Sequence, residues 1–190
     1  MTSATSRSLL ELIDGADERG LAAAGLACLD RCLPLLAADR GDTLRPVWAA
    51  VARGDGGAWG EAAAKALAEL DAEDGEDGDG TGGDVRAMLA TAPPDWTVEA
   101  LRTWAGACSV TALALHGRFD AAGVPDGLVE RCRAGDPTGA GPLLAGEVRR
   151  QQAVLESAAH GPTGLRRARE LSVEGGRVLR AVVSRRARTA

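Results

Sequence analysis

The chain has 190 residues, a length that allows one large helical domain or two small ones. Alanine and leucine dominate, aromatic residues total only 3% and tyrosine is absent, which argues against a protein built on β-sheets. A formal net charge of −5 is unfavourable for binding nucleic acid, and the nearly exclusive use of arginine over lysine is a compositional bias that indicates a bacterial protein.

Turn-forming residues divide the chain into segments with helical spacing, in which short and long segments alternate. In the first half, helices are predicted at residues 6–13, 16–38, 43–53 and 58–70. In the second half, they are predicted at residues 84–90, 97–120, 126–133, 141–160 and 163–188. Pro34 should kink or divide the second helix, because proline removes a backbone hydrogen bond and crowds the carbonyl of Asp30.

The helix at residues 97–120 has the clearest pattern. Thr97 can cap its first turn, where Glu99 complements the helix macrodipole. Its apolar residues recur at spacings of three and four and form one stripe: Val98, Leu101, Ala105, Cys108, Ala112, Leu115 and Phe119. The helix at residues 141–160 has a similar stripe, with Gln151 as its one polar position.

These elements predict an all-α fold, an irregular multi-helix bundle of αα-hairpins that forms a single helical domain over residues 1–190. The long helices begin roughly every 40 residues, which is also the period of two-helix repeats. A short two-helix solenoid-like array is therefore the alternative architecture.

An acidic stretch without any basic residue separates the fourth and fifth predicted helices. It contains Glu69, Asp71, Glu73, Asp74, Glu76, Asp77, Asp79 and Asp84. Interleaved glycines and self-repulsion predict a flexible loop at about residues 72–83. A calcium-loop pattern that starts at Asp77 fails, because its twelfth position is Met88 and not glutamate. The Gly78, Gly80, Gly83 pattern follows no strand, so it does not predict a dinucleotide site either.

The sequence predicts no catalytic, cofactor-binding or metal-binding residue. Cys28 and Cys32 lie one helical turn apart, but zinc needs two more ligands and no second closely spaced pair exists. Small buried core residues explain these cysteines without a metal, although a redox or metal role stays open. His116 has Asp120 four residues on, within contact distance on a helix, and lacks a suitable nucleophile.

Charge is strongly asymmetric along the chain. Residues 161–190 carry Arg166, Arg167, Arg169, Arg177, Arg180, Arg185, Arg186 and Arg188 against Glu170 and Glu174, which gives 8 − 2 = +6 and leaves −5 − 6 = −11 for residues 1–160. The apolar spacing of this segment resembles a helix-turn-helix with its turn at residues 172–176 and a recognition helix carrying Arg177 and Arg180. The alternative is one amphipathic helix, bent at Gly175 and Gly176, that packs Leu165, Leu171, Val178, Leu179 and Val182 on the bundle.

Compartment and partners follow from the same features. Acidic residues arrive too early for a secretory signal, and the longest apolar stretch, residues 20–29, is far shorter than the ~20 residues of a membrane span. Four cysteines without an export signal favour reduced thiols. We therefore expect a cytoplasmic protein with no membrane partner.

The scarcity of catalytic groups favours a non-enzymatic helical interaction or regulatory protein, of the adaptor or inhibitor type. Its partner would be another protein or a second copy of the chain, and no cofactor is expected. A nucleic-acid-binding regulator that uses the Arg-rich segment is the second hypothesis. Under either, the candidate contact residues are Arg177, Arg180, Arg185 and Arg186. The third hypothesis is an enzyme or small-ligand-binding protein whose site is not visible in the sequence and is lined by Trp48, Trp59, Trp96 and Trp104.

Overall fold

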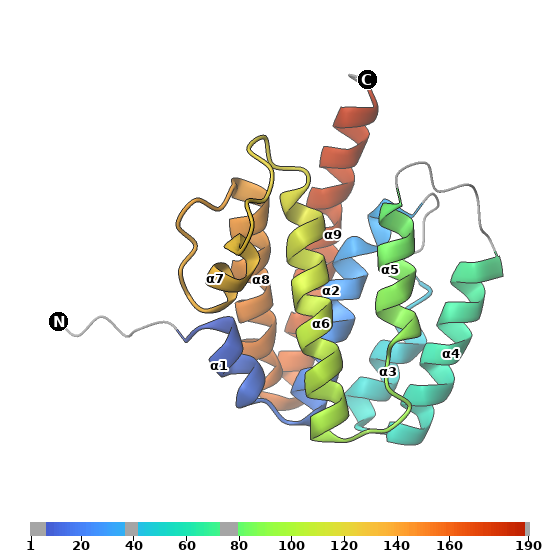
Figure 1. Cartoon of the computed structure of the whole chain (residues 1–190). Helices are drawn as coiled ribbons and strands as arrows, with labels where there is room; N and C mark the ends of the chain where they lie inside the picture. Colours follow the sequence, from blue (N-terminus) through green and yellow to red (C-terminus); the bar gives the residue numbers. More distant parts are fainter. Residues whose placement is uncertain (1–6, 37–41, 73–79, 189–190) are drawn as a thin grey trace.

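The computed structural model describes residues 7–36, 42–72 and 80–188. This part of the chain contains nine α-helices, one 3₁₀ turn and no strand (Figure 1). The elements are α1 (Leu9–Asp14), α2 (Glu18–Cys32), η1 (Leu33–Leu35), α3 (Arg45–Arg53), α4 (Gly56–Ala72), α5 (Thr81–Ala90), α6 (Val98–Gly117), α7 (Leu128–Arg133), α8 (Pro142–Ala158) and α9 (Gly161–Ala187). The predicted all-α multi-helix bundle is confirmed.

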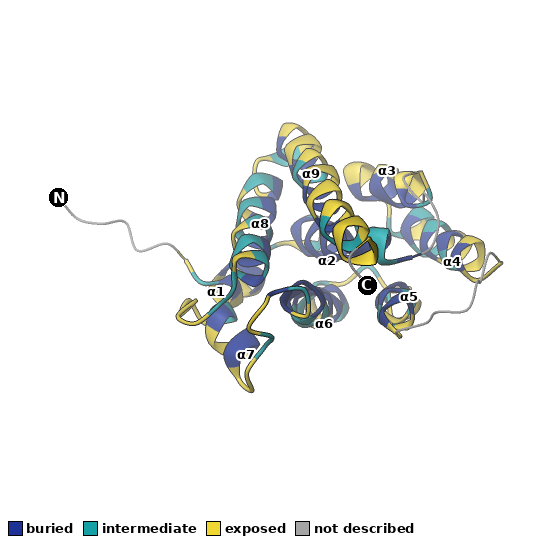
Figure 2. Cartoon of the chain, turned by 90° about the horizontal axis from the view of Figure 1, so that it is seen from above, coloured by how far each residue is buried: buried dark blue, intermediate teal, exposed yellow. Residues whose placement is uncertain are grey.

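Helix α2 forms the centre of the bundle. It contacts α3, α5, α6, α8 and α9, which surround it in the view of Figure 2. Twelve of its 15 residues are buried, and most of these are alanine, glycine or leucine. Small side chains on every face let several helices approach one central helix. Because α2 packs against helices far away in sequence, the bundle is not a linear array of repeats, and the solenoid alternative is wrong.

Local sequence explains where several helices begin and end. The hydroxyl of Ser8 and the carboxylate of Glu11 form a reciprocal capping box at the start of α1. Thr97 caps α6 as predicted, because its side chain accepts a hydrogen bond from the backbone N–H of Ala100 at 3.3 Å. Pro34 divides the second predicted helix: α2 ends at Cys32, and the proline lies in the 3₁₀ turn η1.

Three tryptophans form one aromatic cluster in the core. The ring of Trp59 meets those of Trp96 and Trp104 edge to face, with ring centroids 5.6 and 5.3 Å apart. The indole N–H of Trp59 donates to the carbonyl of Pro93, and that of Trp104 donates to the carbonyl of Met88, each at 2.8 Å. These rings fasten α4 and α5 to α6, so they are packing residues.

The structure corrects one sequence-based expectation and decides between two alternatives. Helix α5 begins at Thr81, where residues up to 83 were expected in the acidic loop, because Gly80 adopts a φ of 76° that starts the helix and Thr81 is buried. Most of the predicted loop, residues 73–79, lies outside the described residues. The single Arg-rich helix predicted at residues 163–188 is present as α9, which runs unbroken through residues 172–176, so the alternative helix-turn-helix is absent.

The continuity of α9 has a local cause. Its middle is held within the bundle by the burial of Ser172, Gly175 and Gly176. The hydroxyl of Ser172 donates to the carbonyl of Ala168 within the same helix, at 2.9 Å. No helix in the described ranges combines the length and the apolar character needed to cross a membrane.

Candidate functional site

Helix α9 packs closely on the bundle through small residues. A Cβ atom on Gly164 would overlap the carbonyl of Ser157 in α8, and one on Gly175 would overlap the side chain of Arg31 in α2. Glycine at these positions therefore lets the α9 backbone approach both helices. The arginines of α9 lie outside this buried stripe, and Figure 2 shows exposed residues along the outer side of the helix.

The first of three connected hollows lies between α3 and the start of α9. Its volume is about 310 Å³. Helix α3 contributes Arg45, Trp48, Ala49 and Ala52, and α9 contributes Pro162, Leu165, Arg166 and Arg169. The hollow runs along α3 from its first residue, Arg45, to Ala52 in its last turn, so its positive potential comes from the three arginines.

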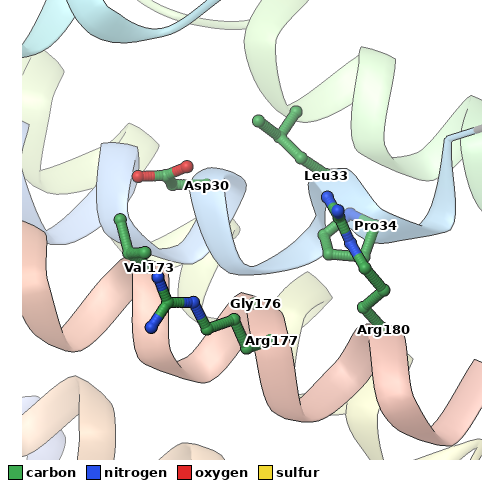
Figure 3. Close-up of a pocket in the computed structure, with 7 residues that line it drawn as sticks. All are labelled: Asp30, Leu33, Pro34, Val173, Gly176, Arg177 and Arg180. Atoms are coloured by element: carbon green, nitrogen blue, oxygen red, sulfur yellow. The ribbon is translucent and has the colours of Figure 1, made fainter. Parts of the chain in front are cut away.

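The second and third hollows continue along α9. The second is lined by Arg166, Arg169, Glu170, Val173, Glu174 and Arg177. The third lies between α9 and the end of α2, and is lined by Asp30, Leu33, Pro34, Val173, Gly176, Arg177 and Arg180 (Figure 3). We call the three together the α9 groove. From Pro162 to Arg180 it covers 19 helical residues, which are 18 steps or about 27 Å along the helix.

The α9 groove is basic along its walls and apolar at intervals. The guanidinium groups of Arg45, Arg166 and Arg177 form no hydrogen bond or ion pair within the part of the chain that the structure describes. Val173, which lines the second and third hollows, is 42% exposed, whereas Val178, which is 36% exposed, lines none of the three. Val178 was expected to pack on the bundle, and its exposure corrects that expectation. Cationic and apolar groups therefore alternate along one open surface.

Asp30 joins the first hollow to the third. Its carboxylate accepts a hydrogen bond from the indole N–H of Trp48 at 3.0 Å. Trp48 lines the first hollow and Asp30 lines the third, so this hydrogen bond joins the two. Burial raises the pKa of Asp30, and the Trp48 hydrogen bond and the charges of Arg31 and Arg169 oppose that effect only in part. This link fixes α3 against α2 beneath the groove.

A buried ion pair lies directly under α9. The guanidinium of Arg31 in α2 donates three hydrogen bonds to the carboxylate of Glu147 in α8, at 2.6 to 3.0 Å, and both side chains are fully buried. The amide of Gln151 donates to the same carboxylate at 3.0 Å. Nε2 of His116 lies 3.5 Å from it. His116 thus pairs with Glu147, whereas the carboxylate of Asp120, its expected partner, accepts from the backbone N–H groups that begin α8.

The ion pair belongs to a network that crosses four helices. The hydroxyl of Ser109 in α6 donates to Oε1 of Gln151 at 2.6 Å, and the guanidinium of Arg133 in α7 donates to that hydroxyl at 3.2 Å. Burial raises the pKa of Glu147, but the charges of Arg31 and His116 and the hydrogen bonds outweigh burial and hold this pKa below its ordinary value. Because Ser109, His116, Arg31 and Glu147 are all buried, no substrate can reach these groups, and the network acts as an internal tie between helices.

The cysteines lie in the same region of the core. Cys28, Cys32 and Cys108 are buried, and burial raises the pKa of each thiol, to about 12 for Cys28. The sulfur of Cys28 accepts a hydrogen bond from Arg31 at 3.5 Å. Within the described ranges, no three His, Cys, Asp or Glu side chains are arranged to hold a metal ion. These thiols are therefore protonated packing groups.

The structure separates the four arginines proposed as contacts. Arg177 and Arg180 line the α9 groove, and Figure 3 shows Arg180 reaching from α9 towards Leu33 and Pro34. Arg185 and Arg186 lie beyond the groove, on the end of α9 that extends past the other helices (Figure 1). The guanidinium of Arg186 covers the ring of Phe119 at 5.1 Å and donates to its carbonyl at 2.9 Å.

Sequence reasoning missed two parts of the site. It did not place Arg45 beside the arginines of α9, because α3 and α9 are far apart in sequence and no pattern links them. It also missed the buried pair, although Glu147 and Gln151 stand four residues apart on the same face of α8, which is a usable signal for a buried polar cluster. Comparisons of the chain with models of protein families, with curated proteins and with solved structures found no match.

Proposed function

We propose that this chain is a non-enzymatic binding protein that takes an acidic segment of a protein partner into the α9 groove. The observation that carries the proposal is the alternation of arginines with apolar side chains along about 27 Å of connected hollows. An amphipathic helix with leucines on one face and carboxylates on its flanks has the complementary pattern. A helix of about 18 to 20 residues matches the length of the groove.

The mixed lining favours a protein segment over nucleic acid. Glu170 and Glu174 lie among the arginines in the second hollow, where they would repel a continuous phosphate backbone. Exposed Val173 offers an apolar contact that phosphate and sugar cannot use. A peptide with both carboxylates and apolar side chains can satisfy the arginines and cover the valine, and leave Glu170 facing solvent.

The test uses a designed probe and matched variants. A blocked 20-residue helical peptide, with leucine at spacings of three and four and with glutamate flanking that stripe, is titrated into the full chain by isothermal calorimetry at low and moderate salt. Arg169→Glu and Arg177→Glu reverse charges inside the groove. Arg167→Glu makes the same charge change on the same helix, but Arg167 lines no hollow of the groove and contacts Glu170 at 3.6 Å.

Binding should weaken at least about tenfold in each groove variant and change little in Arg167→Glu, because charge complementarity acts at the contact. A peptide of equal charge with its leucines dispersed should bind more weakly than the probe. Three outcomes would overturn the proposal: no peptide binding at low salt, tighter binding of a 20-base-pair DNA duplex than of the peptide, or equal losses in all three variants. If the chain self-associates and Arg177→Glu abolishes this self-association, the partner in the groove is a second copy of the chain and not a different protein.

A further inference from the structure

The first hollow of the α9 groove differs from the other two in charge. Three arginines line it, Arg45 from α3 and Arg166 and Arg169 from α9, and no carboxylate among the described residues does. By contrast, Glu170 and Glu174 line the second hollow, and Asp30 lines the third. The positive charge is thus most concentrated, and least compensated, at one end of the groove.

The shape of this hollow leaves room for an anion between the arginines. Ala49 and Ala52 place only methyl groups on the α3 side, and the Trp48 ring is 95% buried, with its N–H engaged by Asp30. Arg45 and Arg166 stand on separate helices, and neither guanidinium group has a hydrogen bond or ion pair among the described residues. A guanidinium presents five N–H donors in a flat fork, so arginines on two walls can grip one tetrahedral oxyanion.

The charge of the ligand follows from the number of cations. One carboxylate supplies a single negative charge and two oxygens, which leaves three guanidiniums under-compensated. A phosphomonoester supplies about −1.5 to −2 at neutral pH and three terminal oxygens. Hydrogen bonds between such oxygens and guanidinium groups are charge-assisted and bidentate. We propose that the hollow between α3 and α9 binds the phosphoryl group of a phosphorylated side chain in the acidic segment, an inference that rests on the proposed function.

The experiment compares three peptides that share the designed probe sequence. They carry serine, phosphoserine or glutamate at one position, and a second set carries the same residues near the opposite end, because a helix can enter a groove in either direction. Binding to the wild-type chain, Arg45→Ala, Arg166→Ala and the control Arg167→Ala is measured by calorimetry. Circular dichroism and melting curves check that every variant folds.

In one of the two sets, phosphoserine should bind at least about tenfold more tightly than serine and clearly more tightly than glutamate. Arg45→Ala and Arg166→Ala should remove most of this gain, and Arg167→Ala should keep it. Inorganic phosphate alone, titrated by ³¹P NMR, should bind weakly to the wild type and not to an Arg45→Ala/Arg166→Ala double variant.

Failure of this inference is separable from failure of the proposed function. If the serine and glutamate peptides bind but phosphoserine adds nothing in either set, the phosphoryl site is wrong and the acidic-segment function stands. A gain that survives in both groove variants also overturns the assignment to this hollow. If no peptide binds, the proposed function is wrong, and the phosphate titration alone then tests the hollow. Equal phosphate binding by the wild type and the double variant would refute the phosphoryl site, and so would the absence of binding to either.

Discussion

Gly25 shows how one missing side chain positions two helices. It lies in α2 against the ring of Trp104 from α6, and a Cβ atom there would overlap three ring carbons. Gly25→Ala should therefore lower the free energy of unfolding by about 1–3 kcal/mol, because an overpacked core must shift. Gly83→Ala is the matched control, since a Cβ atom there meets nothing within 4 Å and should stabilise α5 by about 0.4–1 kcal/mol. Urea unfolding measures both, and similar values for the two variants would contradict the packing argument.

Removing one partner of the Arg31–Glu147 pair should lower the free energy of unfolding much more than replacing both partners by apolar residues. Glu147→Leu leaves the guanidinium of Arg31 buried without its carboxylate, which should lower the free energy of unfolding by about 3–5 kcal/mol. The double variant Arg31→Met/Glu147→Leu removes both charges and should recover most of that loss. Chemical denaturation of the wild type and the three variants, including Arg31→Met, gives the coupling free energy between the two positions. A double variant no more stable than Glu147→Leu would show that the pair also holds the helices in register.

The same pair makes stability depend on pH in the acid range. The pKa of Glu147 lies below its ordinary value of 4.5 in the folded chain, so its contribution to stability is complete above pH 4.5 and is lost as the pH falls through the lowered pKa. The wild type should therefore lose stability on acidification more steeply than Arg31→Met/Glu147→Leu. Denaturation series on either side of pH 4.5 compare them. Parallel pH profiles would contradict a lowered pKa at this site.

At the scale of the element, α9 has two functionally different parts. About its first three-quarters, to Arg180, line the groove, and its last turns project beyond the bundle. A chain that ends at Ser184 lacks Arg185 and Arg186, and should bind the acidic probe peptide as the full chain does. The lost contact of Arg186 with Phe119 is exposed, so the free energy of unfolding should fall by less than about 2 kcal/mol. Calorimetry checks the binding, and a large loss of affinity would move the binding surface to the projecting end.

Helix positions were predictable because their signals are local. Pro34 and the Thr97 cap act within a few residues, and both acted as expected. The turn that the helix-turn-helix alternative needs at residues 172–176 is absent, because the two adjacent glycines there make a tertiary contact and do not end the helix. In α9, the close packing of Gly175 against Arg31 outweighs the low helix propensity of glycine. Nothing in residues 172–176 themselves indicates that they pack against α2, because α2 is far away in the sequence.

Of the candidate site, the sequence predicted only the sign of its charge. The excess of arginine after residue 160 indicated a basic surface, and Arg177 and Arg180 belong to it. The hollow that concentrates charge also needs Arg45, and its position depends on how α3 packs beside α9. Such a contact follows from the whole arrangement of helices, and not from any window of sequence.

At the scale of the whole molecule, the core controls access to the four cysteines, all of which are buried. A thiol reagent should leave Cys28, Cys32 and Cys108 unmodified in the native chain, since the reactive thiolate is suppressed and the sulfur is enclosed. Cys132 lies in the short peripheral helix α7 and should react first, through local opening. Mass spectrometry after timed labelling measures the order. Early labelling of Cys32 would show that α2 opens independently of the bundle.

The link between Trp48 and Asp30 gives the α9 groove a built-in optical reporter. Trp59, Trp96 and Trp104 contact one another in a separate cluster, whereas Trp48 lines the first hollow and donates its N–H to a wall residue of the third. Indole emission responds to the charges and the water around the ring. An anion that enters between Arg45 and Arg166 changes the charges near this one tryptophan. The tryptophan fluorescence of the unlabelled chain should therefore change when a ligand occupies the groove. In Trp48→Phe this change should be absent, although the three clustered tryptophans still fluoresce.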